Sequence, residues 1–259
     1  MKNFLFIAFI LFSFLGFSQN TAIGSQEKLV FTASYNMSGL LTDFAQVSME
    51  TKTVKTSKTT LLHFKCKAQT YSKWNYFFKI NDTYESYVNP NTLSPYLYKR
   101  DINEGGYYKF MKYNFNQKTK TVKSLMRKKR GNGTFWEVNK SYNFGRNTND
   151  IVTTIYKLRN LDLASMTTGS AKTFTVLFDN ETQDITIKLL GKETLKTKIG
   201  TKETYKISLA INNKDLLKGT NSNLLWLTAD KNKIPVYAKF KVAVGNGELR
   251  INSATGLKN

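Results

Sequence analysis

Apolar side chains recur at every second position along most of this chain. In the segment 60–68, for example, apolar residues alternate with His63, Lys65 and Lys67. The same period recurs in six further segments, 29–35, 74–80, 174–178, 185–189, 205–211 and 236–244. Because successive side chains of a strand point to opposite faces, each segment is predicted to be a strand with one buried and one wet face.

Polar or glycine-bearing turns separate these strands. The clearest lie at 116–118, 130–133, 179–181, 200 and 230–233. Ten or more antiparallel strands at such short spacing predict a mostly β fold. We expect one strongly curved sheet, either an open or a closed barrel, with a sandwich as the alternative.

One segment, 150–166, breaks the alternation. Asn149 or Asp150 can cap a first helical turn, and Ile151, Ile155 and Leu158 share one face at helical spacing. We therefore predict one helix of about three turns near 150–160. The segment 139–149 before it is predicted to be a long loop.

The N-terminus has the parts of a secretory signal peptide. Lys2 is followed by the apolar run 4–17, and Gly16 and Ser18 place small residues before Gln19. The run is shorter than the roughly 20 residues that a membrane-spanning helix needs. We predict that residues 1–18 are a cleaved leader and that 19–259 form a single β-rich domain without a transmembrane span. The expected location is the periplasm, with secretion or the cell surface as alternatives.

The residues that usually carry chemistry are few. His63 is the only histidine and is predicted to lie on a lysine-rich surface, whereas Cys66, the only cysteine, is predicted to be an inert core thiol. Glu85, Asp101 and Glu104 lie in different predicted elements and do not suggest a catalytic pair. The sequence predicts no catalytic residue, metal site or cofactor, and a hydrolase is the third-ranked hypothesis.

Positive charge is the strongest chemical signal, because 39 Lys and Arg oppose 18 Asp and Glu. The stretch 105–136 contains no acid, and its aromatic residues lie among its basic ones. Such a pattern suits single-stranded nucleic acid, but export argues against that partner. We expect an anionic envelope component instead, or a charge that only keeps the protein soluble. The candidate residues for binding an anion or a partner are Lys123, Arg127, Lys128, Lys129 and Arg130.

Four short motifs occur in a fixed order between Lys28 and Arg250. They are Tyr84–Val88 with Thr92–Tyr96 and Arg100; Asp150–Val152 with Ile155–Arg159; Gly191–Glu193 with Thr197 and Gly200; and Trp226–Asp230 with Ile234–Val236. Together they resemble an exported bacterial family, domain of unknown function 3108. The resemblance implies a β-rich envelope protein with no established activity.

The motif residues have physical readings of their own. Asp230 can close a tight turn before Pro235, Trp226 can bury a large surface, and Arg159 suits a helix C-terminus. Structural roles are expected for all of them, although Arg100 and Arg159 could instead bind an anion. The full set is Tyr87, Pro95, Arg100, Tyr156, Arg159, Gly191, Glu193, Gly200, Trp226, Asp230 and Pro235.

Two functional hypotheses follow. The first is a non-catalytic binding or carrier module that holds a lipid or another apolar or amphiphilic ligand against a concave, aromatic-rich sheet. The second is an envelope interaction module that docks to a polyanion or a partner protein through its basic surface. The alternation serves a filled core equally well, so the sequence leaves the cavity open as a question.

Overall fold

The structure is a computed structural model that describes residues 19–259 apart from 38–39, 146, 212–222 and 242–244. The predicted leader 1–18 and the end of the predicted strand 236–244 therefore lie outside the described residues. The first eight strands are β1 (Lys28–Met37), β2 (Leu40–Lys55), β3 (Thr60–Thr70), β4 (Asn81–Val88), β5 (Pro95–Glu104), β6 (Tyr107–Asn116), β7 (Thr121–Lys129) and β8 (Phe135–Asn143). The other six are β9 (Ala171–Phe178), β10 (Glu181–Thr197), β11 (Gly200–Ile211), β12 (Leu224–Thr228), β13 (Pro235–Lys241) and β14 (Asn246–Thr255).

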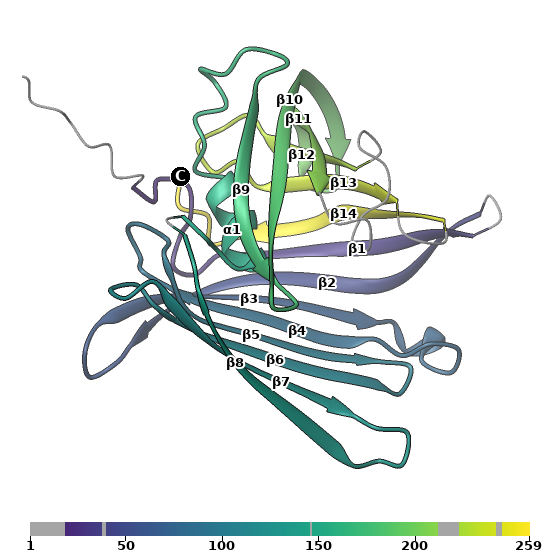
Figure 1. Ribbon diagram of the computed structural model, residues 1–259. Helices are drawn as coiled ribbons and strands as arrows, with labels where there is room; N and C mark the ends of the chain where they lie inside the picture. The colour runs from purple at the N-terminus through teal and green to yellow at the C-terminus, as the bar shows by residue number, and fades with distance from the viewer. Residues whose placement is uncertain (1–18, 38–39, 146, 212–222, 242–244) are drawn as a thin grey trace, which may run out of the picture.

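All fourteen strands belong to one antiparallel sheet. Its order is β8-β7-β6-β5-β4-β3-β2-β1-β14-β13-β12-β11-β10-β9, so the pairing of β1 with β14 joins an N-terminal half to a C-terminal half. In the described part of the chain, no ladder joins the two edge strands β8 and β9. Figure 1 shows the halves curving toward each other around one helix. The prediction of a mostly β, strongly curved antiparallel sheet with one helix is confirmed, in the open form.

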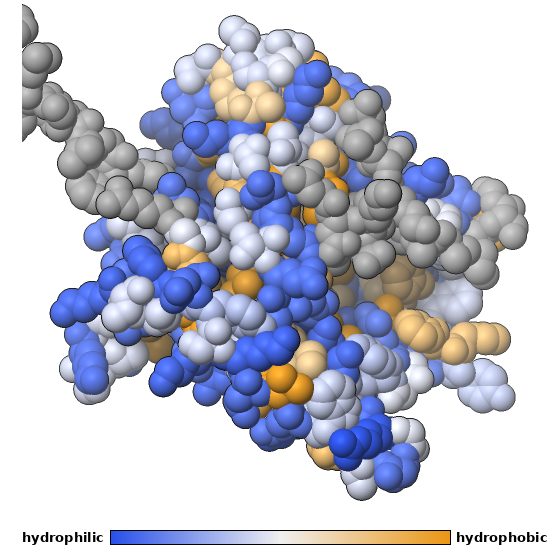
Figure 2. All heavy atoms as spheres, viewed as in Figure 1, coloured by the Kyte–Doolittle hydropathy of each residue, from blue (hydrophilic) through white to orange (hydrophobic). Residues whose placement is uncertain are grey.

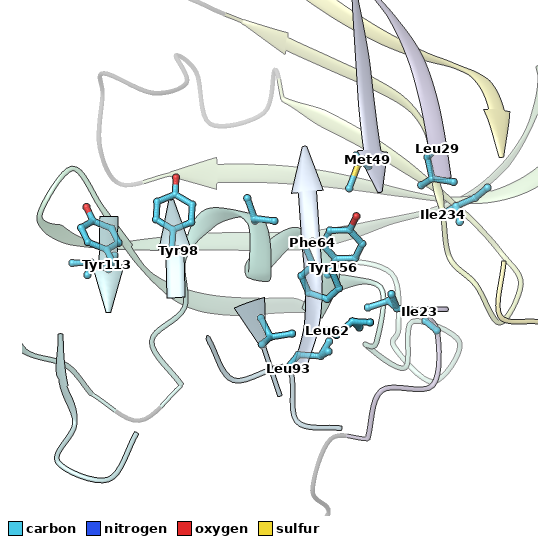
Figure 3. Packing of buried hydrophobic residues seen from close by; sticks show 14 of the residues in the cluster. Ile23, Leu29, Met49, Leu62, Phe64, Leu93, Tyr98, Tyr113, Tyr156 and Ile234 are labelled. Carbon is cyan, nitrogen blue, oxygen red and sulfur yellow. The ribbon is translucent and has the colours of Figure 1, made fainter. Parts of the chain in front are cut away.

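The interior between the halves is built from the predicted apolar faces. Leu62 and Phe64 of β3 and Tyr98 of β5 are buried on the N-terminal half, together with Leu29 of β1. Figure 3 shows Phe64 and Leu62 beside Tyr156, with Tyr98 and Leu29 farther away on either side. A second buried cluster lies on the C-terminal half and includes Ile187 and Ile207. Burial of these aliphatic and aromatic side chains is the main favourable contribution that stabilises the curved form of the sheet.

The helix α1 (Ile151–Leu158) lies between the two halves and contacts β3, β4 and β9. Asp150 caps it as predicted, because its carboxylate accepts the backbone N–H of Thr153 at 2.8 Å. The helix is shorter than the predicted three turns. It ends at Leu158, beyond which the amides of Asn160 and Leu161 donate to the carbonyls of Lys157 and Leu158, three residues back, at 3.0 and 3.2 Å.

The predicted packing face of α1 is wrong in part. Val152, Tyr156 and Leu158 are buried, but Ile155 is 37% exposed. The helix packs on both sheet halves at once, so the buried surface spans more than one helical stripe.

Two other predictions are corrected. The segment 74–80 is not a strand: a short 3₁₀ helix, η1 (Ser72–Trp74), begins a loop that reaches to β4. The amides of Phe77 and Phe78 both donate to the carbonyl of Trp74, which curls the chain. The predicted long loop 139–149 is also too long, since β8 continues to Asn143 by pairing with β7.

Candidate functional site

An apolar cavity of about 180 Å³ lies between α1, the strands β1 and β2, and the C-terminal half of the sheet. Nearly all of its accessible lining is apolar. Its wall includes Phe31, Val47, Met49, Ile155, Leu209, Leu225, Leu227, Ala238 and Leu249. An apolar cavity of roughly 150 Å³ stays dry and binds benzene-sized molecules, so this one can hold a small apolar group or one end of a chain.

Ile155 forms the helical wall of this cavity. Its side chain is 37% exposed although the helix lies between the two halves of the sheet. Because Ile155 lines the cavity, part of this exposed surface faces the cavity. Native interiors are close-packed with few voids, so an accessible isoleucine at this place marks a space that the residues described by the structure do not fill.

The opposite side of α1 is filled. The ring of Tyr156 stacks on Phe64 with centroids 3.8 Å apart, as Figure 3 shows. Asp150 accepts hydrogen bonds at 2.7 Å from the hydroxyls of Ser86 and Thr153. Burial raises the pKa of Asp150, and these hydrogen bonds partly oppose that rise. The contacts fix the rotation of α1 on β3 and β4, and hence the direction of Ile155.

A buried ion pair closes the cavity at the end of the helix. The two terminal guanidinium nitrogens of Arg159, Nη1 and Nη2, donate to Glu27 at 2.6 and 2.7 Å, and both side chains are inaccessible to solvent. Arg159 Nε also donates to the carbonyl of Asn232 at 3.0 Å. Because its donors are engaged within the protein, the geometry favours a structural role over anion binding.

A polar seam ties the two halves together where the β9–β10 turn meets the N-terminal half. Asp179 pairs with Arg100, and it accepts from Lys109 Nζ at 2.5 Å. Burial would raise the pKa of Asp179, but Lys109 and Arg100 together hold it below its usual value. The amide of Asn180 donates to the Tyr113 hydroxyl at 2.9 Å. Arg100 thus joins the halves of the sheet.

The other family-motif residues shape turns and irregular strands. Asp230 accepts from the amides of Asn232 and Lys233, each at 2.9 Å, which confirms the predicted tight turn. Trp226 is buried, and its indole N–H donates to Glu193. Five motif residues remain. Tyr87 stacks on His63, Pro95 begins β5, and Gly200 lies at a hairpin turn. Gly191 and Pro235 lie where the strand register shifts.

The structure does not bring the five basic candidates together. Exposed Lys123, Arg127 and Lys129 alternate along one face of β7, whereas Lys128 lies on the other face with its Nζ 5.9 Å from the ring centre of Trp136. Arg127 pairs with Glu137 at 2.5 Å. Arg130 lies in the loop that follows.

Of the two potentially reactive residues, Cys66 lies as predicted and His63 does not. Burial raises the pKa of the Cys66 thiol to about 12, as expected for an inert core cysteine. His63 is not the open surface histidine that was predicted. Its ring stacks on Tyr87 at 4.3 Å, and Nε2 lies 2.9 Å from Glu85, so its side chain is only 13% exposed. Cross-strand neighbours on β4 cover it.

One carboxylate was missed by the sequence reasoning. Asp82 is buried, and its pKa is raised to about 7 by burial and by the neighbouring Glu104, against the lowering effect of the Asn103 amide at 2.8 Å. The available signal was the alternation itself, which places Asp82 on the inner face of β4 with Ser86 and Val88.

The fold and the cavity together define a β-barrel-like sheet that stays open at its edges and curves around a central helix. The chain belongs to the family described as protein of unknown function (DUF3108), whose model matches residues 30–252. This confirms the family resemblance. No curated protein matches the sequence.

Two solved structures are similar to the chain. The beta-barrel-like protein of domain of unknown function DUF1849 from Brucella abortus has a TM-score of 0.53 and 7% identity, and the alignment covers 92% of this chain and 99% of that chain. A Bacteroides fragilis protein with a YmcC-like fold has a TM-score of 0.33 and 8% identity over the same shares of the two chains. The first likeness supports the fold alone.

Proposed function

We propose that this protein is a non-catalytic binding or carrier module that holds an apolar or amphiphilic ligand in the cavity beside α1. The observation that carries the proposal is the accessible Ile155 at the wall of an almost wholly apolar cavity. Ligand sites are concave and largely apolar, with few polar groups. The volume of this cavity suits the end of one acyl chain or a small ring.

Two matched substitutions test this proposal. Ile155→Trp fills the cavity from the helix, whereas Leu190→Trp makes a similar change at a residue of equal exposure on β10. We expect Ile155→Trp to weaken binding of an anilinonaphthalene dye, and of competing fatty acids, by about tenfold or more. Leu190→Trp should bind as the wild type does. Equal binding by all three proteins would overturn the cavity as the site.

Native mass spectrometry supplies a second test that needs no chosen ligand. Protein purified from its own host under mild conditions should carry a co-purifying apolar molecule, which organic extraction would identify. The Ile155→Trp variant should carry less of it. A wild-type protein that is always empty and does not bind the dye would rule out a carrier role.

We also propose that the protein acts outside the inner membrane, as a single mature domain of residues 19–259. The sequence of the leader supports this proposal. Within the described residues, no helix is long and apolar enough to cross a bilayer. Fractionation of the native host, with mass measurement of the N-terminus, should find periplasmic protein that begins at Gln19. Cytoplasmic protein with an intact N-terminus would contradict this expectation.

Docking to a polyanion is the second candidate function. It is supported by the outer face of β7, where Lys123 and Lys129 are exposed. Such binding should fall steeply as salt rises. Lys123→Gln with Lys129→Gln should weaken it, whereas Lys172→Gln with Lys188→Gln on β9 and β10 should not.

A further inference from the structure

The exposed apolar side chains are concentrated at one end of the N-terminal half. Its strands follow one another in antiparallel order, so the end of β1, the start of β2 and the β3–β4, β5–β6 and β7–β8 connections all lie at the same end, on the right in Figure 1. Among the described residues, seven of the ten exposed large apolar side chains lie here. We call these seven the aromatic rim: Leu40, Leu41, Tyr76, Phe77, Phe78, Tyr107 and Phe135.

The β3–β4 connection forms the most prominent part of the rim. The indole of Trp74 donates to the carbonyl of Asp43 at 2.9 Å, which anchors the loop on β2. Tyr76 is then 92% exposed and Phe77 is 76% exposed, with their rings 5.6 Å apart. In Figure 2, hydrophobic side chains protrude at the right edge of the molecule, where Figure 1 places this loop.

The rim is held together rather than being a set of independent loops. Phe78 lies against Gly105 in the β5–β6 turn, so closely that a Cβ there would lie 2.6 Å from its ring. Gly105 also has a φ of +52° and donates its amide to the carbonyl of Lys79 at 2.9 Å. The positive φ favours glycine, and any larger residue would displace the ring of Phe78. The aromatic side chains are therefore presented on a defined frame.

Basic side chains lie among the aromatic ones. Lys73 and Lys79 flank the exposed loop, and Lys129 and Arg130 lead into Phe135. A groove of about 460 Å³ runs between these connections, and its lining includes Lys79, Lys129, Tyr108 and Phe135. A groove with two lysines above aromatic walls offers a place for an anionic headgroup.

The opposite end of the same strands has a different character. The β2–β3 turn consists of Thr56, Ser57, Lys58 and Thr59, and Lys118 lies in the β6–β7 turn. Leu93 of the β4–β5 turn is buried. The rim is thus not a general consequence of hairpin ends in this sheet.

We propose that the aromatic rim docks onto the surface of an anionic lipid bilayer. Aromatic rings with a polar handle and lysines both suit the headgroup level of a membrane. Lysine is depleted in protein–protein interfaces, so the same mixture fits a second protein less well. This proposal is independent of the cavity, because no rim residue lines it.

Vesicle co-sedimentation tests the proposal with purified mature protein. Phosphatidylcholine vesicles should bind weakly, and vesicles that also contain phosphatidylglycerol should bind strongly. Replacing Tyr76 and Phe77 by Ser should weaken binding to the anionic vesicles by about tenfold or more. Both side chains are highly exposed, so the variant should unfold at the wild-type urea concentration. The matched control is Tyr96→Ser with Leu190→Ser, two exposed apolar residues away from the rim, which should leave binding unchanged.

Two double variants that remove the same charge distinguish binding by the rim from attraction by the net charge of the protein. Lys73→Gln with Lys79→Gln should weaken binding to anionic vesicles more than Lys58→Gln with Lys118→Gln, which removes the same charge at the other end. Equal losses would overturn the proposal. It would also fall if the Tyr76 and Phe77 substitutions abolished self-association in sedimentation velocity but left vesicle binding intact, because the rim would then be a protein interface. Ile155→Trp should not affect vesicle binding, so failure of either proposal can be recognised separately.

Discussion

The two sides of α1 differ in how completely the protein fills them. Toward β3 and β4, Tyr156 stacks on Phe64, and Asp150 is enclosed by hydrogen bonds to Ser86 and Thr153. Toward β1, β2 and the strands β11–β14, Ile155 stays accessible at the wall of an apolar cavity. One short helix therefore belongs both to a packed core and to an open space. The difference indicates that the filled side carries stability, which leaves the open side free to accept a ligand.

The largest expected effect tests the ion pair that anchors the C-terminal end of α1 between the two sides. Glu27→Gln leaves the buried guanidinium of Arg159 without its countercharge, so we expect unfolding free energy to fall by about 3–5 kcal/mol. Glu137→Gln, which breaks the exposed pair with Arg127, should cost less than about 1 kcal/mol. Urea unfolding measures both. If the two substitutions cost the same, the Glu27 pair does not anchor α1.

The aromatic stack is the next test. Phe64→Ala removes the ring that Tyr156 covers and should lower stability by about 3 kcal/mol, through lost burial and the cavity left behind. The control Phe135→Ala removes an exposed ring and should cost less than about 0.5 kcal/mol. A small loss for Phe64→Ala would mean that the filled side is looser than the structure indicates.

The pH dependence adds a test of a buried acid on β4, one of the strands that α1 packs against. Because the folded pKa of Asp82 is about 7 and an unfolded aspartate titrates near 3.9, the folded state binds the extra proton between these values. The stabilisation of the folded state by this proton is complete at low pH and is lost as the pH rises toward 7. We expect a loss of about 1–2 kcal/mol across that window relative to Asp82→Asn, which stays neutral. If the difference between the two proteins does not change with pH, Asp82 is solvated rather than enclosed.

Much of the filled side could be predicted from the sequence, because local rules determine it. Alternation identified β3 and its buried Phe64, and the capping preference of Asp150 located the start of α1. The same rules failed for Trp74 and Phe78, whose alternation occurs in a loop that Trp74 anchors by a long-range hydrogen bond. The periodicity shows which residues are apolar, but it does not show which residues far apart in the sequence are in contact.

The open side could not be predicted for a related physical reason. Helical spacing correctly marked Ile155 as apolar, but a buried stripe and a cavity wall have the same pattern. Whether Ile155 meets a neighbour depends on how far the C-terminal half curves, which follows from twist and strand irregularities summed over many strands. The alternation of β4 places Asp82 on the inner face, but the raised pKa also depends on Glu104 and Asn103 from another strand, which the pattern does not show.

The smallest expected effect is the most direct test of the open side. Ile155→Ala removes a side chain that already faces a void, so we expect a loss below about 1 kcal/mol, whereas a packed isoleucine would cost roughly 2–5 kcal/mol. Leu190→Ala, at equal exposure on β10, should cost a similar amount. Only Ile155→Ala enlarges the cavity, so it alone should shift fatty-acid preference toward bulkier or longer chains. A loss of several kcal/mol for Ile155→Ala would show that the protein fills this side as well, and the contrast between the two faces of α1 would disappear.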